Sequence, residues 1–192
     1  METVTGRDYA IQAQSDKYDN VPYSSLDCQG FVEKVLKDCK VTKPDGTYYN
    51  WKGSNSMWRN ALAWKGTIEE CKLIYDCIPL GAWVFIVKND GGEQERGYFD
   101  DQGNAVHVGI YCNDSNLPVR DSTKNNKRNG VGYRSLKGFT HVGLPLMIRF
   151  KDDISASDAL RSVSILRDIS SSDIDFLKAL TTLTEYIMRG DA

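Results

Sequence analysis

Residues 26–32 read Leu-Asp-Cys-Gln-Gly-Phe-Val, and residues 106–111 read Val-His-Val-Gly-Ile-Tyr. The first stretch places Cys28 where a helix should begin, and the second places His107 within a strand-like run. A thiol at a helix N-terminus and an imidazole on a rigid strand are the two groups that thiol-based nucleophilic catalysis requires. The chain has only two histidines, so few residues can serve as the base.

A helix is expected to begin at Cys28. Asp27 stands where an N-cap residue should be, and apolar residues then recur at helical spacing, at Phe31, Val32, Val35, Leu36 and Cys39. The unpaired N–H groups at such a helix start favour the thiolate of Cys28, and the Cys28 N–H can itself donate to an oxyanion. The alternative interpretation is that Cys28 is a small buried hydrophobe on an amphipathic helix.

The segment 106–112 alternates as a half-buried strand does, with His107 opposite the aliphatic face. Gly109 leaves room beside the imidazole. His141, in a similar His-Val-Gly sequence, is the alternative base, and a half-exposed histidine without a role is the alternative interpretation of His107. The residues expected on the core face are Val106, Val108, Ile110 and Cys112.

A third polar group is needed to orient the imidazole through its other ring nitrogen. Asp121 lies on the next expected strand, where its carboxylate can hold and stabilise the imidazolium. The alternative is a surface aspartate paired with the neighbouring Arg120. Arg120, Arg128 and Arg134 are candidates for binding substrate carboxylates, although single surface arginines are usually only solvated.

Helical patterns come first along the chain and strand-like segments follow, which predicts an α+β fold with N-terminal helices, one of them starting at the nucleophile, packed on an antiparallel sheet. We divide the chain into a domain at 1–150 and a helical C-terminal extension at 151–192, where an amphipathic helix starts near Ser172. Helices are expected at 7–17, from 28 onward and at 56–63, and strands at 81–87, 106–112, 119–123, 131–135, 141–144 and 147–150.

Length and composition argue against several classes of function. A chain of 192 residues, 41% hydrophobic, suits one globular domain with an appendage. The net charge of −2 and the lack of a long basic run argue against nucleic acid as a partner. We expect neither a signal peptide nor membrane insertion, because residues 1–8 contain no apolar run and no stretch is long and apolar enough to span a membrane. The five cysteines show no paired Cys-x-x-Cys spacing, so we expect free thiols and neither a metal nor a cofactor.

These motifs resemble the NlpC-type cysteine peptidases of bacterial cell walls, a papain-like family, over roughly residues 8–150. The family signature Asp-Cys-Ser-Gly-Phe/Leu-Val stands here at 27–32, with Gln29 in place of the serine at a helical position that we expect to face outward. The family's His-Val-Gly-Ile-Tyr strand is intact at 107–111. The run Gly-Ala-Trp-Val-Phe at 81–85 is similar to the strand entry that lies between them.

The resemblance implies an NlpC-type fold in which Cys28 is the nucleophile, His107 the general base and Asp121 the orienting group, in a place where the family more often has histidine. Tyr23 corresponds to the family's tyrosine upstream of the cysteine, which lines the site and can stabilise the oxyanion, and Tyr18 is the alternative. A groove is expected between the 89–104 loop and the tryptophan-bearing segment 51–64, whose tryptophans belong either to the groove or to the core.

The activity that the resemblance implies is hydrolysis of peptidoglycan stem peptides, between γ-D-glutamate and a diamino acid, without metal or cofactor. A thiol protease of this kind, made in a bacterial cytoplasm, would reach the cell wall by phage lysis, a phage tail or a secretion route, which fits a prophage origin. The C-terminal helix is expected to pack back on the domain, to form a homodimer or to dock on a phage or secretion partner. Two alternatives stay open: an amidase, transglutaminase or acyltransferase with the same Cys28/His107 pair, and a non-catalytic phage-tail module.

Overall fold

The computed structural model describes residues 4–88, 103–113, 115–125 and 127–150. Within these residues, six strands form one sheet in the order β1-β6-β2-β3-β4-β5, and all neighbouring strands in it are antiparallel. The predicted class, helices with an antiparallel sheet, is thereby confirmed. The strands are β1 Leu62–Thr67, β2 Trp83–Lys88, β3 Asn104–Tyr111, β4 Val119–Lys124, β5 Asn129–Arg134 and β6 His141–Pro145. The helices are α1 Gly6–Ala13, α2 Cys28–Asp38, α3 Ser54–Asn60 and α4 Ile68–Tyr75, with a short 3-10 helix, η1, at Asp16–Tyr18.

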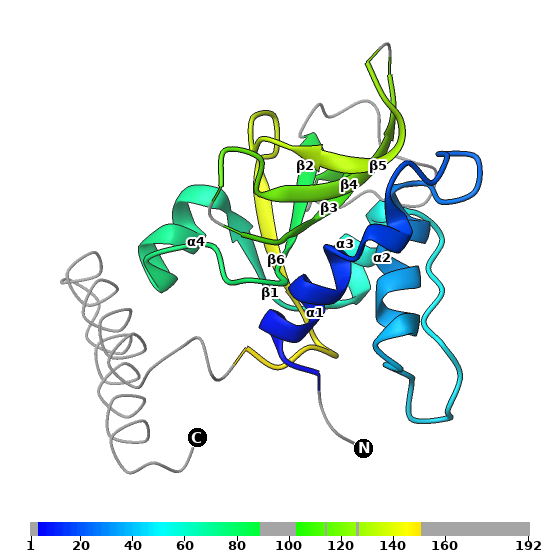
Figure 1. The fold of residues 1–192 in the computed structure, drawn as a ribbon. Coiled ribbons are helices and arrows are strands. Elements are labelled where there is room, and N and C mark those ends of the chain that lie inside the picture. The colour runs from blue at the N-terminus through cyan, green and yellow to red at the C-terminus, as the bar shows by residue number, and fades with distance from the viewer. Residues whose placement is uncertain (1–3, 89–102, 114, 126, 151–192) are drawn as a thin grey trace, which may run out of the picture.

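Helix α2 starts at the predicted residue and packs against the middle of the sheet. Asp27 caps it by accepting a hydrogen bond from the N–H of Gly30 at 2.6 Å. The apolar face of α2 packs on β3 and β4, and α1 packs on α2 in turn, whereas α4 lies at the other end of the sheet against β1 and β6 (Figure 1). The N-terminus of α2 therefore lies beside the two strands that carry His107 and Asp121. The core residues of α2 are Phe31, Val32, Val35 and Leu36.

A β-bulge interrupts β3 next to His107. Ile86 of β2 pairs with His107, but the next residue, Val87, pairs with Ala105, so Val106 is the extra residue of the bulge. The side chain of Val106 is 48% exposed. The prediction that Val106 lies on the core face is therefore wrong, because the bulge breaks the two-residue alternation on which the prediction depended. Val108, Ile110 and Cys112 are buried as predicted.

The two ends of the described domain meet. Thr5 forms an isolated parallel bridge with Arg149, and the Gly6 N–H donates to the Arg149 carbonyl at 2.9 Å. Residues 147–150 form no strand beyond this bridge, so the predicted strand there is wrong. The domain is thus closed by backbone pairing between its N-terminus and the segment that follows β6.

Several other boundaries differ from the sequence predictions. The helix expected at 7–17 ends at Ala13 and is followed by η1. The helix expected at 56–63 is α3, which starts at Ser54 and ends at Asn60. Strand β1 and helix α4 were not predicted at all. The predicted helix near Ser172, the extension at 151–192 and most of the 89–104 loop lie outside the described residues. In the part of the chain that is described, no helix has both the length and the apolar character needed to cross a membrane.

Candidate active site

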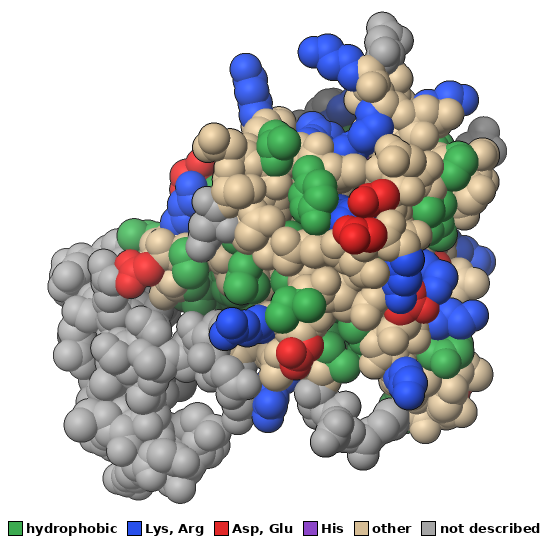
Figure 2. All heavy atoms as spheres, in the orientation of Figure 1, with side chains coloured by type: hydrophobic (Ala, Val, Ile, Leu, Met, Phe, Trp, Pro, Cys, Tyr) green, Lys and Arg blue, Asp and Glu red, His purple; other side chains and the backbone are tan. Residues whose placement is uncertain are grey.

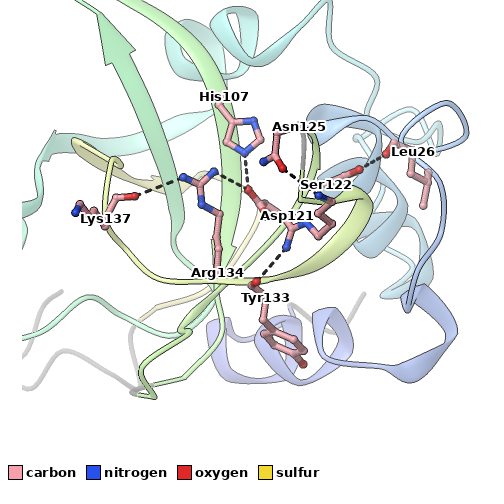
Figure 3. A network of polar contacts seen from close by, with 9 residues as sticks. Leu26, His107, Asp121, Ser122, Asn125, Tyr133, Arg134 and Lys137 are labelled. Atoms are coloured by element: carbon pink, nitrogen blue, oxygen red, sulfur yellow. Dashed lines mark hydrogen bonds and ion pairs between the residues drawn. The ribbon is translucent and has the colours of Figure 1, made fainter.

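Cys28 is half-buried at the first position of α2. The N–H groups of a first helical turn have no partner within the helix, so they are available to a negative charge placed there. The segment before Cys28 is held to the sheet by the Ser122 hydroxyl of β4, which donates to the Leu26 carbonyl (Figure 3). The cysteine is therefore fixed from both sides, by its own helix and by β4.

His107 and Asp121 form a direct pair between neighbouring strands. His107 Nε2 lies 2.6 Å from Asp121 Oδ2, and the His107 side chain is 12% exposed while Asp121 is completely buried (Figure 3). The His107 ring also packs against Phe139, with centroids 5.8 Å apart. Because Nε2 is engaged by Asp121, Nδ1 is the ring nitrogen left to face the thiol.

The Cys28 thiol lies close enough to His107 to act on the pKa of the imidazole. Burial by itself lowers the pKa of His107, but the hydrogen bonds to Asp121 and Cys28, together with their charges, outweigh burial and raise it from 6.5 to about 9. His107 is therefore an imidazolium at neutral pH, placed between a thiol and a buried carboxylate. The structure thus brings Cys28, His107 and Asp121 together in one chain of contacts.

Two arginines complete the surroundings of Asp121. Arg128 forms an ion pair with Oδ1 of Asp121, and Arg134 donates to Oδ2 at 3.3 Å. Neither is the isolated, solvated arginine that the sequence suggested. Arg120 is fully buried and pairs with Asp19, with its Nη1 donating to the Tyr133 hydroxyl at 3.0 Å. It is therefore neither the partner of Asp121 nor a surface group for a substrate carboxylate.

Tyr23 lies near the thiol, whereas Tyr18 is engaged elsewhere. Burial raises the pKa of Tyr23, and the negative charges of Cys28 and Asp27 raise it further, so its hydroxyl stays protonated and can donate. The Tyr18 hydroxyl donates to Asp38 at 2.6 Å and accepts from Gln12 at 3.1 Å, at the opposite end of α2. Of the two tyrosines, Tyr23 is the one whose pKa is raised by the charge of Cys28.

His141, the alternative base, has different neighbours. Its Nδ1 lies 2.9 Å from the Thr140 hydroxyl, and its ring meets Trp58 edge-on with centroids 5.3 Å apart. Burial lowers the pKa of His141, while Glu70 and Glu69 of α4 oppose that shift. His141 is thus grouped with the α4 end of the sheet, and His107 with Cys28.

Gln29 has a structural task that the sequence did not reveal. Its side-chain carbonyl accepts from the Gly53 N–H, and its amide donates to the Trp51 carbonyl. Glu33, one turn on, accepts from the Trp51 N–H at 2.6 Å. The expectation that Gln29 faces outward is therefore wrong: it fastens the 51–53 loop beside the nucleophile, through contacts that no local pattern encodes.

Two buried side-chain hydrogen bonds hold the start of β3. The Ser54 hydroxyl donates to the Ala105 carbonyl at 2.7 Å, and the Asn55 amide donates to Asn104 at 3.0 Å. These hydrogen bonds fix the backbone at Ala105, two residues before His107. Trp58 of the same segment is a core residue, whereas Trp51 is half-buried and stacks on Tyr49 at 5.1 Å.

Among the described residues, no group of three or more His, Cys, Asp or Glu side chains is arranged to hold a metal ion. None of the five cysteines, all of which lie in the described residues, forms a disulfide, and Cys28 is the cysteine that acts on the pKa of His107.

The chain was compared with known proteins in three ways. No protein-family model matches it, and neither a curated protein nor a solved structure gives a match.

Proposed function

We propose that this protein is a cysteine peptidase that hydrolyses peptidoglycan stem peptides, with Cys28 as nucleophile, His107 as base and acid, and Asp121 as the orienting group. The observation that carries the proposal is the position of His107, whose Nε2 lies 2.6 Å from the buried carboxylate of Asp121 and whose pKa is raised in part by the nearby Cys28 thiol. A helix N-terminus at the thiol supports it further, since such a terminus stabilises a thiolate.

The proposed reaction has two stages. The Cys28 thiolate attacks the amide carbonyl carbon, and the oxyanion that forms accepts from the Cys28 N–H and from Tyr23. The carbon–nitrogen bond then breaks, and the imidazolium of His107 gives its proton to the leaving amine. Water attacks the resulting thioester, His107 takes up the water proton, and the acid product leaves as the thiolate is restored.

The resemblance to NlpC-type peptidases supports the substrate class. It rests on the motif at 27–32 and the intact His-Val-Gly-Ile-Tyr at 107–111, and it points to the bond between γ-D-glutamate and a diamino acid. An amidase or acyltransferase would use the same three side chains, because this arrangement suits any acyl transfer through a thioester.

Digestion of purified peptidoglycan of the diaminopimelate and lysine types tests the proposal. Wild type should release fragments with a new amine on the diamino acid, and Cys28→Ala should lose at least about a thousandfold in rate. Cys77→Ala, which removes an exposed thiol on another part of the surface, is the matched control and should cleave as wild type does.

Mass spectrometry of the fragments separates the outcomes. Release of whole stem peptides from muramic acid would show that the enzyme is an amidase and not a peptidase. A folded wild-type protein that cleaves neither wall, and whose Cys28 reacts with iodoacetamide no faster than a free thiol, would refute the enzyme and favour a non-catalytic module.

A further inference from the structure

The surroundings of Asp121 contain more charge than orienting an imidazole requires. In the proposed mechanism one carboxylate suffices for that task, yet two guanidinium groups contact the same carboxylate. We propose that Arg128 and Arg134 are positioning residues that fix the Asp121 carboxylate and limit how firmly it holds the proton on His107. This inference rests on the proposed function and deepens it.

Both oxygens of Asp121 are occupied in a defined way. Oδ1 is bound by Nη2 of Arg128, whereas Oδ2 is shared between His107 Nε2 at 2.6 Å and Arg134 Nη1 at 3.3 Å. Figure 3 shows Arg134 and His107 approaching Asp121 from neighbouring strands of the sheet. The carboxylate therefore cannot rotate away from His107 without losing an ion pair on the other side.

Arg128 is itself held in place, and a glycine makes the space for it. Its Nη1 donates to the Tyr133 carbonyl at 3.0 Å. The guanidinium lies over Gly132, the residue that pairs with Asp121 across β4 and β5. A β-carbon at Gly132 would lie 2.8 Å from Arg128 Nη1, so a side chain there would displace the arginine from its position.

Arg134 is held through the same aromatic ring that supports His107. Its Nη2 donates to the Lys137 carbonyl at 3.4 Å, and its guanidinium lies 4.8 Å from the centre of the Phe139 ring. Because Phe139 also packs against the imidazole, the arginine and the histidine share one support.

The β4–β5 hairpin that carries these arginines is basic, and Asp121 is the acidic residue that pairs with them. From Ser122 to Lys151 the sequence has no Asp or Glu. Lys124 and Lys127 are exposed, and Lys and Arg side chains project around the tip of the β4–β5 hairpin at the top of Figure 2. The ionisable groups that face His107 are then the buried Asp121 from β4, the half-buried Cys28 from α2, and the two partly exposed arginines behind Asp121.

The direction of the effect follows from these charges. A lone buried carboxylate would bind the imidazolium proton strongly, and an imidazolium that holds its proton too firmly is a poor acid for the leaving amine. Two positive charges behind the carboxylate weaken that attraction. Removing either arginine should therefore raise the pKa of His107 above its wild-type value of about 9.

Histidine titration by NMR measures this directly, since the chain has only two histidines. His141→Gln removes the second signal and assigns the first. In Arg128→Gln and in Arg134→Gln, the pKa of His107 should rise by about 0.5 to 1 unit, which is roughly three- to tenfold in proton affinity. Gly132→Ala, which changes no charge but displaces Arg128, should shift it in the same direction by less.

Lys127→Gln is the matched control, because it removes an exposed positive charge from the same hairpin and should leave the pKa of His107 where it is. Arg128→Lys keeps the positive charge, so the pKa of His107 in this variant should be close to that of wild type. Arg128→Lys can be measured even if Arg128→Gln fails to fold. The proposal is overturned if both arginine variants leave the pKa of His107 unchanged, lower it, or shift it no more than Lys127→Gln does.

The titration needs no substrate, so it is independent of the peptidoglycan assay. Wild type that leaves peptidoglycan intact would refute the proposed hydrolysis, while the titration would still decide whether the arginines act on His107. A kcat for stem-peptide cleavage that falls in Arg128→Gln, with KM unchanged and the pH profile moved upward, is the result expected when both hold.

Discussion

Single side chains set the charge of the candidate site. Asp121 is completely buried and still carries three polar partners, while His107 links it to the half-buried Cys28. A buried charge is tolerated only when it is paired. Removing one partner of Asp121 therefore leaves part of its buried charge uncompensated, which destabilises the folded protein. The pKa of His107 therefore depends on Asp121, on its two arginine partners and on Cys28.

The raised pKa of His107 predicts how stability depends on pH. Because the folded-state pKa of about 9 exceeds the ordinary value of 6.5, protonated His107 contributes stability that is complete below about pH 6.5 and is lost as pH rises through about 9. Urea unfolding between pH 6 and 10 should show this decline in wild type. In His107→Gln the decline should be smaller, and an equal decline in both proteins would contradict the assignment.

At the scale of elements, α2 is positioned by contacts at several points along its length. Its N-terminus is capped by Asp27 and tied through Gln29 to the 51–53 loop. Its C-terminus is anchored by Asp38, whose pKa is lowered to about 2 because hydrogen bonds from Lys34, Tyr18 and Lys17 outweigh the effect of burial. The helix can therefore hold the thiol at a constant place relative to β3.

Gln29→Ala should destabilise the protein by about 1–3 kcal/mol, because backbone groups of Trp51 and Gly53 would lose their partners in a half-buried place. Lys37→Ala, on the exposed face of the same helix, is the control and should change stability by less than about 0.5 kcal/mol. Both values come from urea unfolding at neutral pH. Equal effects of the two substitutions would show that the loop contacts carry no stability.

At the scale of the whole molecule, the chain closes on itself around Gly6. A β-carbon at Gly6 would overlap the Leu80 carbonyl oxygen and lie 2.7 Å from Phe150 Cε1. Gly81, opposite, has a φ of 83° and approaches the Gly6 backbone as closely. The start of α1, the entry to β2 and the end of the described domain thus meet where no side chain fits.

Gly6→Ala should therefore cost about 2–4 kcal/mol, since backbone atoms rather than flexible side-chain ends would have to move. Thermal and urea unfolding measure the loss. Ile11→Ala, which truncates an exposed side chain on the same helix, should stay within about 0.5 kcal/mol of wild type. A stability for Gly6→Ala equal to that of wild type would show that this contact is loose in solution.

Some features missed in the sequence were present there as local signals. Helix α4 starts with a capping box in which Thr67 and Glu70 exchange hydrogen bonds, and Thr-x-x-Glu is a recognisable pattern. Strand β1 ends directly at that cap and has an irregular register with β6, so its alternation is weak. The bulge at Val106 has no such local signal, because it depends on how β2 pairs with β3.

The sequence by itself determined the helix that begins at Cys28, the strand that carries His107 and the class of the fold, because capping and periodicity act between residues a few positions apart. Only the tertiary structure decided that His107 rather than His141 meets Cys28 and that Arg128 and Arg134 bind Asp121. These contacts depend on strand order and register, which bring distant residues together and which no short stretch of sequence encodes.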